Sequence, residues 1–253
     1  MYKQFFIATI GAFLAIFIFL FIFQRKLIYF PDNQDFDRCS AFEDVEKINW
    51  QGTRMYVNKI SDKWLVFYHG NAGSACDRSF FIELLQDTNY SYLFVEYTGY
   101  SGDPGTPSQI ALMKNVEGVV GYLNSRNAKR VIVLGESLGT SLAAYHNFLE
   151  TPDKTLLISS FSSLENVVQA KFQFFPVGLF LFDKYPTEKW IRNSNNLLFI
   201  HGAKDEVVPI EFGQRLFESV QGKNKTFIII KDAGHNDIYN HSLTKDSIKN
   251  FLR

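Results

Sequence analysis

A serine between two glycines is the residue of this chain whose setting most favours nucleophilic chemistry. Ser137 stands at the centre of Gly135-Glu-Ser-Leu-Gly139, behind the apolar run 131–134 and ahead of a helix-forming stretch. A turn too tight for Cβ atoms explains the two glycines, and its strained backbone lifts the serine hydroxyl clear of a sheet. The pattern G-x-S-x-G between a strand and a helix therefore predicts a nucleophile at Ser137.

A nucleophilic serine needs a general base and a carboxylate that orients the base, and both follow in the expected order. The apolar run 196–202 is followed by Asp205, and the run 226–230 is followed by a loop that carries His235. Both residues come just past the carboxyl ends of predicted strands, where open α/β sheets carry their sites. We predict that Ser137 attacks an acyl carbonyl, that His235 takes and returns the proton, and that Asp205 fixes the imidazole tautomer.

Other histidines and acids compete for these roles. Three histidines have settings typical of packed, hydrogen-bonded or solvated residues, and these are His146, His201 and His241. Three acids stay open as alternatives to Asp205, because one is its neighbour and two flank the proposed base: Glu206, Asp232 and Asp237.

A loop rich in small residues predicts the donors that stabilise a developing oxyanion. The apolar run 64–68 leads into His-Gly-Asn-Ala-Gly-Ser at 69–74, where small residues allow the main chain to approach a reacting carbonyl. The expected donors are the backbone N–H groups of Asn71 and Leu138. The alternative is a plain glycine turn that leads into the helix predicted from residue 79.

Four motifs in this order resemble the α/β-hydrolase superfamily, and more narrowly the Bem46-like and ABHD13/ABHD17-like serine hydrolases. They are Phe-Tyr-His-Gly-Asn-Ala-Gly-Ser at 67–74, Gly-Glu-Ser-Leu-Gly at 135–139, His-Gly-Ala-Lys-Asp-Glu-Val-Val-Pro at 201–209 and Gly-His-Asn at 234–236. The resemblance runs from about residue 50 to the C-terminus. It implies an α/β-hydrolase fold with a mostly parallel central sheet flanked by helices. It also implies carboxylic-ester or thioester hydrolysis without a cofactor, with the site residues already proposed.

Composition narrows the class of protein. The chain has 253 residues, 46% of them apolar, and a formal net charge of zero, so no basic patch favours nucleic-acid binding. The sequence has no Cys or His cluster at metal spacing and no P-loop, so we expect neither a metal nor a cofactor. We expect a small-molecule or lipid acyl substrate, while protein partners cannot be named from the sequence.

The N-terminus predicts a membrane anchor over residues 1–26. Residues 5–23 carry no charge, and Arg25 and Lys26 follow them at a headgroup boundary. Nineteen helical residues span about 28 Å, close to the hydrocarbon thickness of a bilayer, so we expect a single-pass transmembrane helix. A cleavable signal peptide fits less well, because no small-residue cleavage site follows. Lysine and arginine counts leave the orientation open, and the resemblance favours an extracytoplasmic or lumenal hydrolase domain.

The remaining boundaries follow from the same pattern. We expect a linker over 27–44 and a hydrolase domain over 45–253, which opens with an antiparallel strand pair turned at Gln51-Gly52. Within it, the aromatic stretch 172–190 predicts a small cap insertion at about 163–192, unless those aromatic side chains simply pack on the core. No distinct family pattern aligns over 162–190, so the substrate cannot be identified there.

Two questions stay open at this level. Cys39 and Cys76 are the only cysteines, and they are either free thiols or a disulfide that an oxidising compartment would permit. The favoured function is a membrane-anchored serine hydrolase of acyl esters or thioesters. The alternatives are a serine peptidase or amidase with the same triad, and a catalytically silent relative that binds a lipid or a partner.

Overall fold

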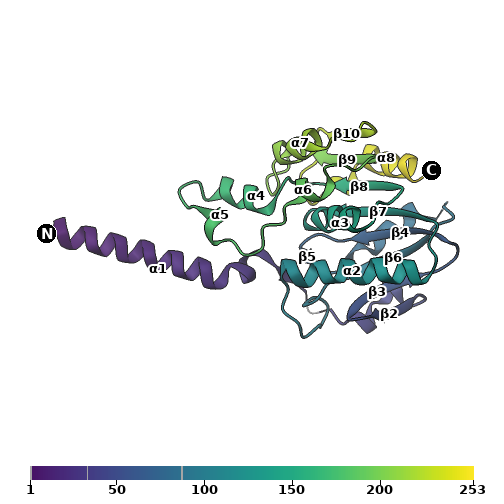
Figure 1. Ribbon diagram of the computed structural model, residues 1–253, viewed down its shortest axis with the longest axis horizontal. Helices are drawn as coiled ribbons and strands as arrows, with labels where there is room; N and C mark the ends of the chain where they lie inside the picture. Colours follow the sequence, from purple (N-terminus) through teal and green to yellow (C-terminus); the bar gives the residue numbers. More distant parts are fainter. Residues whose placement is uncertain (1, 33, 87) are drawn as a thin grey trace.

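An eight-stranded sheet forms the centre of the molecule, with the strand order β10-β9-β8-β7-β4-β6-β3-β2 (Figure 1). The computed structural model describes the whole chain except residues 1, 33 and 87, and leaves out the side chains of residues 3, 8, 10, 12 and 13. Strands β4 to β10 of this sheet run parallel, while β3 pairs antiparallel with both β2 and β6. The strands are β2 (Glu46–Trp50), β3 (Thr53–Asn58), β4 (Lys63–Tyr68), β6 (Ser91–Glu96), β7 (Arg130–Glu136), β8 (Lys154–Ile158), β9 (Leu197–Gly202) and β10 (Lys225–Ile230).

The predicted mostly parallel sheet flanked by helices is confirmed, as is the opening antiparallel pair. Gln51 and Gly52 turn that pair with φ values of +50° and +85°. The α-helices of the globular part are α2 (Gln109–Ser125), α3 (Leu138–Leu149), α4 (Leu164–Lys171), α5 (Val177–Phe180), α6 (Thr187–Ile191), α7 (Ile210–Ser219) and α8 (Ser242–Leu252). Shorter 3-10 helices are η1 (Phe36–Arg38), η2 (Ser40–Phe42), η3 (Cys76–Leu84) and η4 (Ile238–Asn240).

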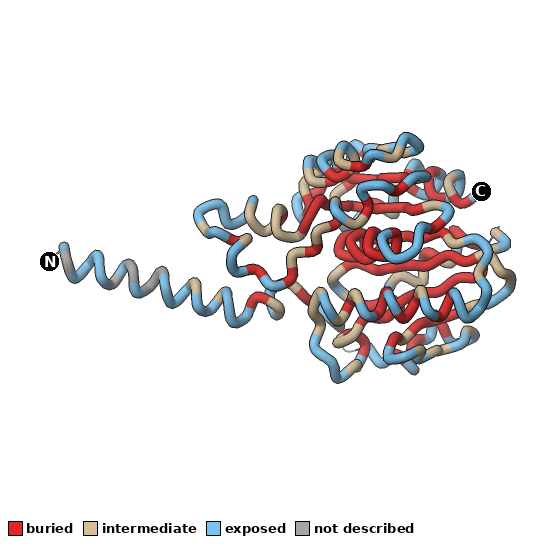
Figure 2. The backbone as a smooth tube through the Cα atoms, in the orientation of Figure 1, coloured by how far each residue is buried: buried red, intermediate tan, exposed pale blue. Residues whose placement is uncertain are grey.

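Alternation along the strands builds one core on each face of the sheet. In β4, Trp64, Val66 and Tyr68 belong to the cluster that contains α2, α3 and α7 side chains, whereas Leu65 and Phe67 belong to the cluster beneath η3 and α8. Successive strand residues point to opposite faces, so a continuous apolar run is what a strand covered on both sides requires. Figure 2 shows the resulting buried strands, with helix α3 equally buried and helix α2 more exposed.

Helix α1 (Tyr2–Ile28) extends away from the globular part (Figure 1). Its C-terminal half contacts the segment after β8: the rings of Phe17 and Phe180 lie edge to face with centroids 4.5 Å apart, and Arg25 Nε lies 3.1 Å from Asp183 Oδ2. The predicted helix over 5–23 is therefore present. Among the residues that the structure describes, however, no helix combines the length and apolarity that crossing a membrane requires. The transmembrane part of the prediction is not supported.

The segment expected as a linker packs on the globular part. Phe36 and Phe42 are buried, and the Phe42 ring stacks on Tyr56 with centroids 4.3 Å apart. Cys39 and Cys76 form a disulfide, which settles the choice left open by the sequence. Closing a loop with a sequence separation of 37 residues stabilises the fold by about 3–4 kcal/mol on the chain-entropy model.

The segment expected as a cap, about 163–192, forms α4, α5 and α6. Its α4–α5 part lies next to α1 (Figure 1), whereas Tyr185, Trp190 and Ile191 pack on the core of the sheet. Phe174 is 93% exposed and Leu179 is 78% exposed, so this segment offers apolar side chains to its surroundings. The prediction that it covers the active site stays a prediction.

Candidate active site

Ser137 occupies a sharp turn between β7 and α3. Its φ and ψ angles are +50° and −116°, a strained conformation for a residue with a side chain. A Cβ on Gly135 would lie 2.4 Å from the carbonyl oxygen of Gly139, and a Cβ on Gly139 would lie 2.1 Å from that of Tyr68. No other residue fits at these two positions without moving backbone, so the glycines around the serine are explained by close approach.

The proposed base and acid form a continuous hydrogen-bonded chain with the serine. His235 Nε2 lies 3.0 Å from Ser137 Oγ, and His235 Nδ1 lies 2.7 Å from Asp205 Oδ2. Ser137 follows β7, Asp205 follows β9 and His235 follows β10, so three parallel strands deliver the three side chains to one edge of the sheet. This is the geometry in which a carboxylate orients an imidazole that in turn accepts a serine proton.

Asp205 is buried and held as an anion. Its Oδ1 accepts hydrogen bonds from the N–H groups of Val207 and Val208 at 3.0 and 2.8 Å. Burial alone would raise the pKa of Asp205, but hydrogen bonds from His201, His235 and the backbone outweigh it and hold that pKa well below its usual range. An anionic Asp205 fixes His235 with its proton on Nδ1, which leaves Nε2 free to accept from Ser137.

The alternative acids and histidines lie in other settings. Asp232 pairs with Lys204 at 2.8 Å, Asp237 accepts from the Gly234 N–H at 2.7 Å, and Glu206 is exposed. Among the alternative histidines, His201 contacts the proposed acid. Its Nε2 lies 2.9 Å from the carbonyl oxygen of Val208 and 3.5 Å from Asp205 Oδ2, so it supports Asp205. The other two histidines considered as alternatives to His235 are His146 and His241. Burial lowers the pKa of His146 to about 3, and His241 lies at the N-terminal end of α8.

The loop expected to supply oxyanion donors follows β4 and includes the short strand β5 (Ala72–Gly73). Leu138 is the first residue of α3, where a helix N-terminus presents unpaired N–H groups. Asn71 lies in the loop, and its carbonyl oxygen and side-chain Oδ1 accept from the Tyr100 hydroxyl at 2.9 and 3.0 Å. The Tyr100 hydroxyl thus holds Asn71 in place, and the role of the two N–H groups as oxyanion donors stays a prediction.

The same loop is tied to the end of α1. The Asn71 side chain donates to the carbonyl oxygen of Ile28, and β5 pairs in parallel with β1 (Phe30–Pro31). On the other side, the Tyr97 hydroxyl donates to the carbonyl oxygen of His69 at 2.7 Å. Tyr97 and Tyr100 were not anticipated, because nothing in the residues around them indicates a partner 28 or 29 positions away.

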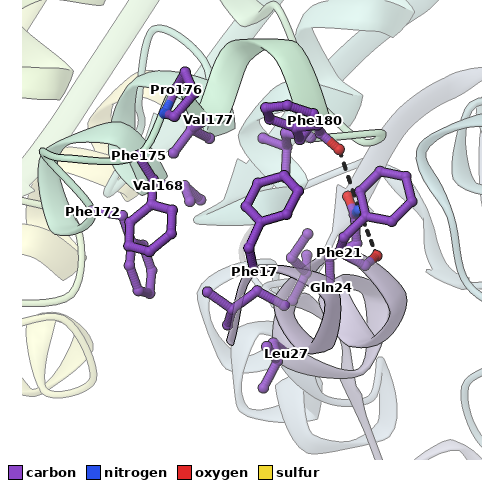
Figure 3. A pocket seen from close by; sticks show the side chains of 13 residues that line it. Phe17, Phe21, Gln24, Leu27, Val168, Phe172, Phe175, Pro176, Val177 and Phe180 are labelled. Atoms are coloured by element: carbon purple, nitrogen blue, oxygen red, sulfur yellow. Dashed lines mark hydrogen bonds between the residues drawn. The ribbon is translucent and has the colours of Figure 1, made fainter. Parts of the chain in front are cut away.

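Two hollows lie close to these residues. One, of about 750 Å³, is lined by His235 together with Arg78, Glu136 and Tyr239 among others. The other, of about 420 Å³, lies between α1 and the α4–α5 segment and is lined mainly by apolar side chains (Figure 3). Ile28 lines this second pocket and accepts the hydrogen bond from Asn71, so the pocket is adjacent to the loop expected to supply the oxyanion donors.

In the part of the chain that the structure describes, acidic, histidine and cysteine side chains form no cluster that could hold a metal ion. The polar groups around Ser137 are instead paired with one another, as in the chain from Ser137 to Asp205.

Curated proteins of similar sequence are found in bacteria and animals, although no protein-family model matches the chain. The uncharacterized Mycobacterium tuberculosis protein Rv2307c is 28% identical over 97% of this chain and 94% of its own length. The uncharacterized Escherichia coli protein YfhR is 27% identical over 85% of this chain and 81% of its own. Human alpha/beta hydrolase domain-containing protein 17B is 28% identical over 74% of this chain, which corresponds to 65% of that protein.

Solved structures share the fold at low sequence identity. The Pyrococcus furiosus esterase PF2001 aligns with a TM-score of 0.67 at 16% identity, over 89% of this chain and 97% of that one. Mouse alpha/beta hydrolase domain-containing protein 10 aligns with a TM-score of 0.61 at 14% identity, over 83% of this chain and 96% of that one. These likenesses show the α/β-hydrolase fold.

The lowered pKa of Asp205 predicts how the stability of the fold depends on pH in acid. Because its pKa is lower in the folded chain than the value of about 3.9 in an unfolded one, the stabilisation is present above pH 4 and is lost as the pH falls below it. We expect the unfolding free energy of wild type to decline more steeply between pH 4 and pH 2 than that of Asp205→Asn. The difference between the two slopes against pH should correspond to the uptake of at most one proton on unfolding. Denaturant titrations at several pH values measure this, and equal slopes would contradict the assignment.

Proposed function

We propose that this chain, which has the α/β-hydrolase fold and is 28% identical to human alpha/beta hydrolase domain-containing protein 17B, belongs to the same superfamily and is a serine hydrolase of acyl esters or thioesters. The observation that carries the proposal is the hydrogen-bonded chain from Ser137 Oγ through His235 to Asp205. A silent relative that only binds a ligand has no need of an anionic carboxylate aligned on an imidazole that reaches a strained serine.

The reaction follows from the positions of these groups. Ser137 Oγ attacks the acyl carbonyl carbon while His235 Nε2 accepts the hydroxyl proton, and the carbonyl electrons move to the oxygen. The N–H groups of Asn71 and Leu138 stabilise the oxyanion. Collapse breaks the bond to the alcohol or thiol, which leaves with the proton from His235. Water then attacks the acyl-serine by the same route and releases the carboxylic acid.

The apolar pocket between α1 and the α4–α5 segment supports an acyl group as the retained part of the substrate. Its volume of about 420 Å³ falls within the range of roughly 300–1,000 Å³ typical of small-ligand sites. Its polar side chain, Gln24, already donates to the Phe180 carbonyl oxygen and accepts from the Phe182 N–H. The rest of the lining is apolar, as an alkyl chain requires (Figure 3).

Attachment to a membrane is also part of the proposal. Phe5, Ile7, Ile16 and Ile22 of α1 are each more than half exposed, and such a surface is unfavourable in water. A bilayer would cover it and would bring lipid acyl chains to the pocket that α1 lines. The disulfide between Cys39 and Cys76 favours an oxidising compartment for the hydrolase domain, either extracytoplasmic or lumenal.

Replacing the nucleophile tests the activity directly. We expect Ser137→Ala to lose fluorophosphonate labelling and to lower ester hydrolysis by several orders of magnitude, because the residual rate depends on binding and oxyanion stabilisation alone. Ser141→Ala is the matched control, since this serine lies one helical turn further along α3 and its hydroxyl bonds to Thr187 at 2.6 Å. Full labelling of Ser137→Ala would overturn the proposal, and preferential cleavage of an amide with the same acyl group would favour a peptidase.

Narrowing the pocket tests the acyl site. Val168 lines the pocket, so Val168→Trp removes space for an alkyl chain. Because each buried methylene contributes about 0.8 kcal/mol, we expect kcat/KM for a dodecanoyl ester to fall at least about tenfold relative to an acetyl ester. Leu179→Trp is the control, because Leu179 is exposed and does not line the pocket. An unchanged ratio of the two esters in Val168→Trp would rule out this pocket as the acyl site.

Membrane attachment and compartment can be measured on one sample. We expect the full-length protein to stay with membranes after carbonate washing, and its two cysteines to be alkylated only after reduction. Release by carbonate would contradict attachment through α1. Alkylation of both thiols before reduction would contradict an oxidising compartment.

A further inference from the structure

The carboxylate that precedes the nucleophile joins two other segments of the candidate active site. Arg78 Nε lies 3.1 and 3.0 Å from Glu136 Oε1 and Oε2, and Arg78 Nη2 lies 2.9 Å from Oε1. The Tyr239 hydroxyl donates to Glu136 Oε2 at 3.1 Å. One side chain thereby connects the serine turn with η3, which carries Arg78, and with η4, which carries Tyr239.

Each of these segments adjoins a group that the proposed reaction needs. Arg78 Nη2 also donates to the carbonyl oxygen of Ala72, next to Asn71 in the oxyanion loop, at 3.2 Å. A Cβ on Gly70 would lie 2.7 Å from Glu136 Oε1, so the backbone of that loop runs directly against the carboxylate. Tyr239 comes shortly after His235 in the chain and lines the same hollow.

Partial burial strengthens these contacts. The side chains of Arg78 and Glu136 are 18% and 14% exposed, so water competes weakly for them. Burial acts to lower the pKa of Arg78, but the charge of Glu136 outweighs it and raises that pKa, so Arg78 stays cationic. Burial, with the nearby negative charge of Glu136, raises the pKa of Tyr239 well above its usual value, so its phenol remains a donor.

We propose that Glu136 is a positioning residue for the reaction. This inference rests on the proposed hydrolase function. Glu136 sets the spacing between the oxyanion loop, Ser137 and His235 through Arg78 and Tyr239. Because a displacement of about 1 Å in an active site costs up to about 100-fold in rate, loss of the carboxylate acts on kcat rather than on substrate binding.

The experiment measures turnover per working site in the full-length protein. Active sites of wild type, Glu136→Ala, Glu136→Gln and Tyr239→Phe are titrated with a fluorophosphonate, and kcat and KM are then measured with one acyl ester. We expect Glu136→Ala to lower kcat per titrated site at least about tenfold while KM changes less than about threefold. Glu136→Gln keeps the size and one acceptor oxygen, so it should recover part of the loss.

A second tyrosine–glutamate pair supplies the controls. The Tyr145 hydroxyl donates to Glu117 Oε1 at 2.9 Å between α3 and α2, away from the serine turn. Tyr145→Phe and Glu117→Ala should leave kcat per titrated site within about twofold of wild type, whatever their effect on melting temperature.

Hydrogen exchange gives a readout that does not depend on catalysis. We expect Glu136→Ala to increase amide exchange in both 69–74 and 234–240, whereas Glu117→Ala leaves both segments unchanged. Unchanged kcat per site together with unchanged exchange in Glu136→Ala would overturn the positioning role. If the wild-type protein neither reacts with the fluorophosphonate nor hydrolyses the acyl ester, the proposed function is overturned instead. The comparison of amide exchange would still decide the role of Glu136.

Discussion

The parallel pairing of β4 with β7 is the constraint on which the site depends. Their register sets Phe67 opposite Leu134 and Tyr68 opposite Gly135, so both strands end at the same level. The loop 69–74, which carries the proposed oxyanion donor Asn71, and the serine turn therefore begin side by side. Their separation is limited by backbone contact, because a Cβ on Gly139 would lie 2.1 Å from the Tyr68 carbonyl oxygen. A side chain at that position would push the two loops apart and remove the donor geometry that an oxyanion needs.

Parallel neighbours extend this arrangement to His235 and Asp205, the proposed base and acid. β8 connects β7 with β9 and β10, so Asp205 and His235 emerge at the same edge as Ser137. Backbone pairing fixes where each strand ends, and polar side chains such as Tyr100 and Glu136 then fix how the loops lie. The end of α1 joins this network through the Ile28 carbonyl oxygen. A change at the N-terminal helix is thus only a few contacts away from Ser137.

Local patterns account for the part of the site that the sequence could predict. The glycines around Ser137 and the loops after two apolar runs are signals within a few residues, and the three side chains they indicate lie within hydrogen-bond distance. Arg78 and Glu136 are separated by 58 positions, and an ion pair over that distance leaves no local pattern. The segment 27–44 was expected to be a linker, with a polar stretch over 30–37, yet buried Phe36 and Phe42 are enough to pack it on the globular part. The spacing of Cys39 and Cys76 could not decide whether they pair either, because the packing that brings residue 39 to residue 76 leaves no local pattern.

The disulfide also sets a problem of assembly order. Cys39 and Cys76 enclose β2, β3 and β4 in one covalent ring, but in the finished sheet β6 lies between β3 and β4. Neighbouring strands are about 4.8 Å apart, so β3 and β4 must stand roughly 10 Å from each other to admit the later strand. Both cysteines precede β6 in the chain, so a disulfide that formed early would close this ring before β6 has taken its place in the sheet. All six residues of β6 are buried in the final structure. Their burial supplies the driving force to part the two older strands, and a ring in which β3 and β4 paired early would be a kinetic trap.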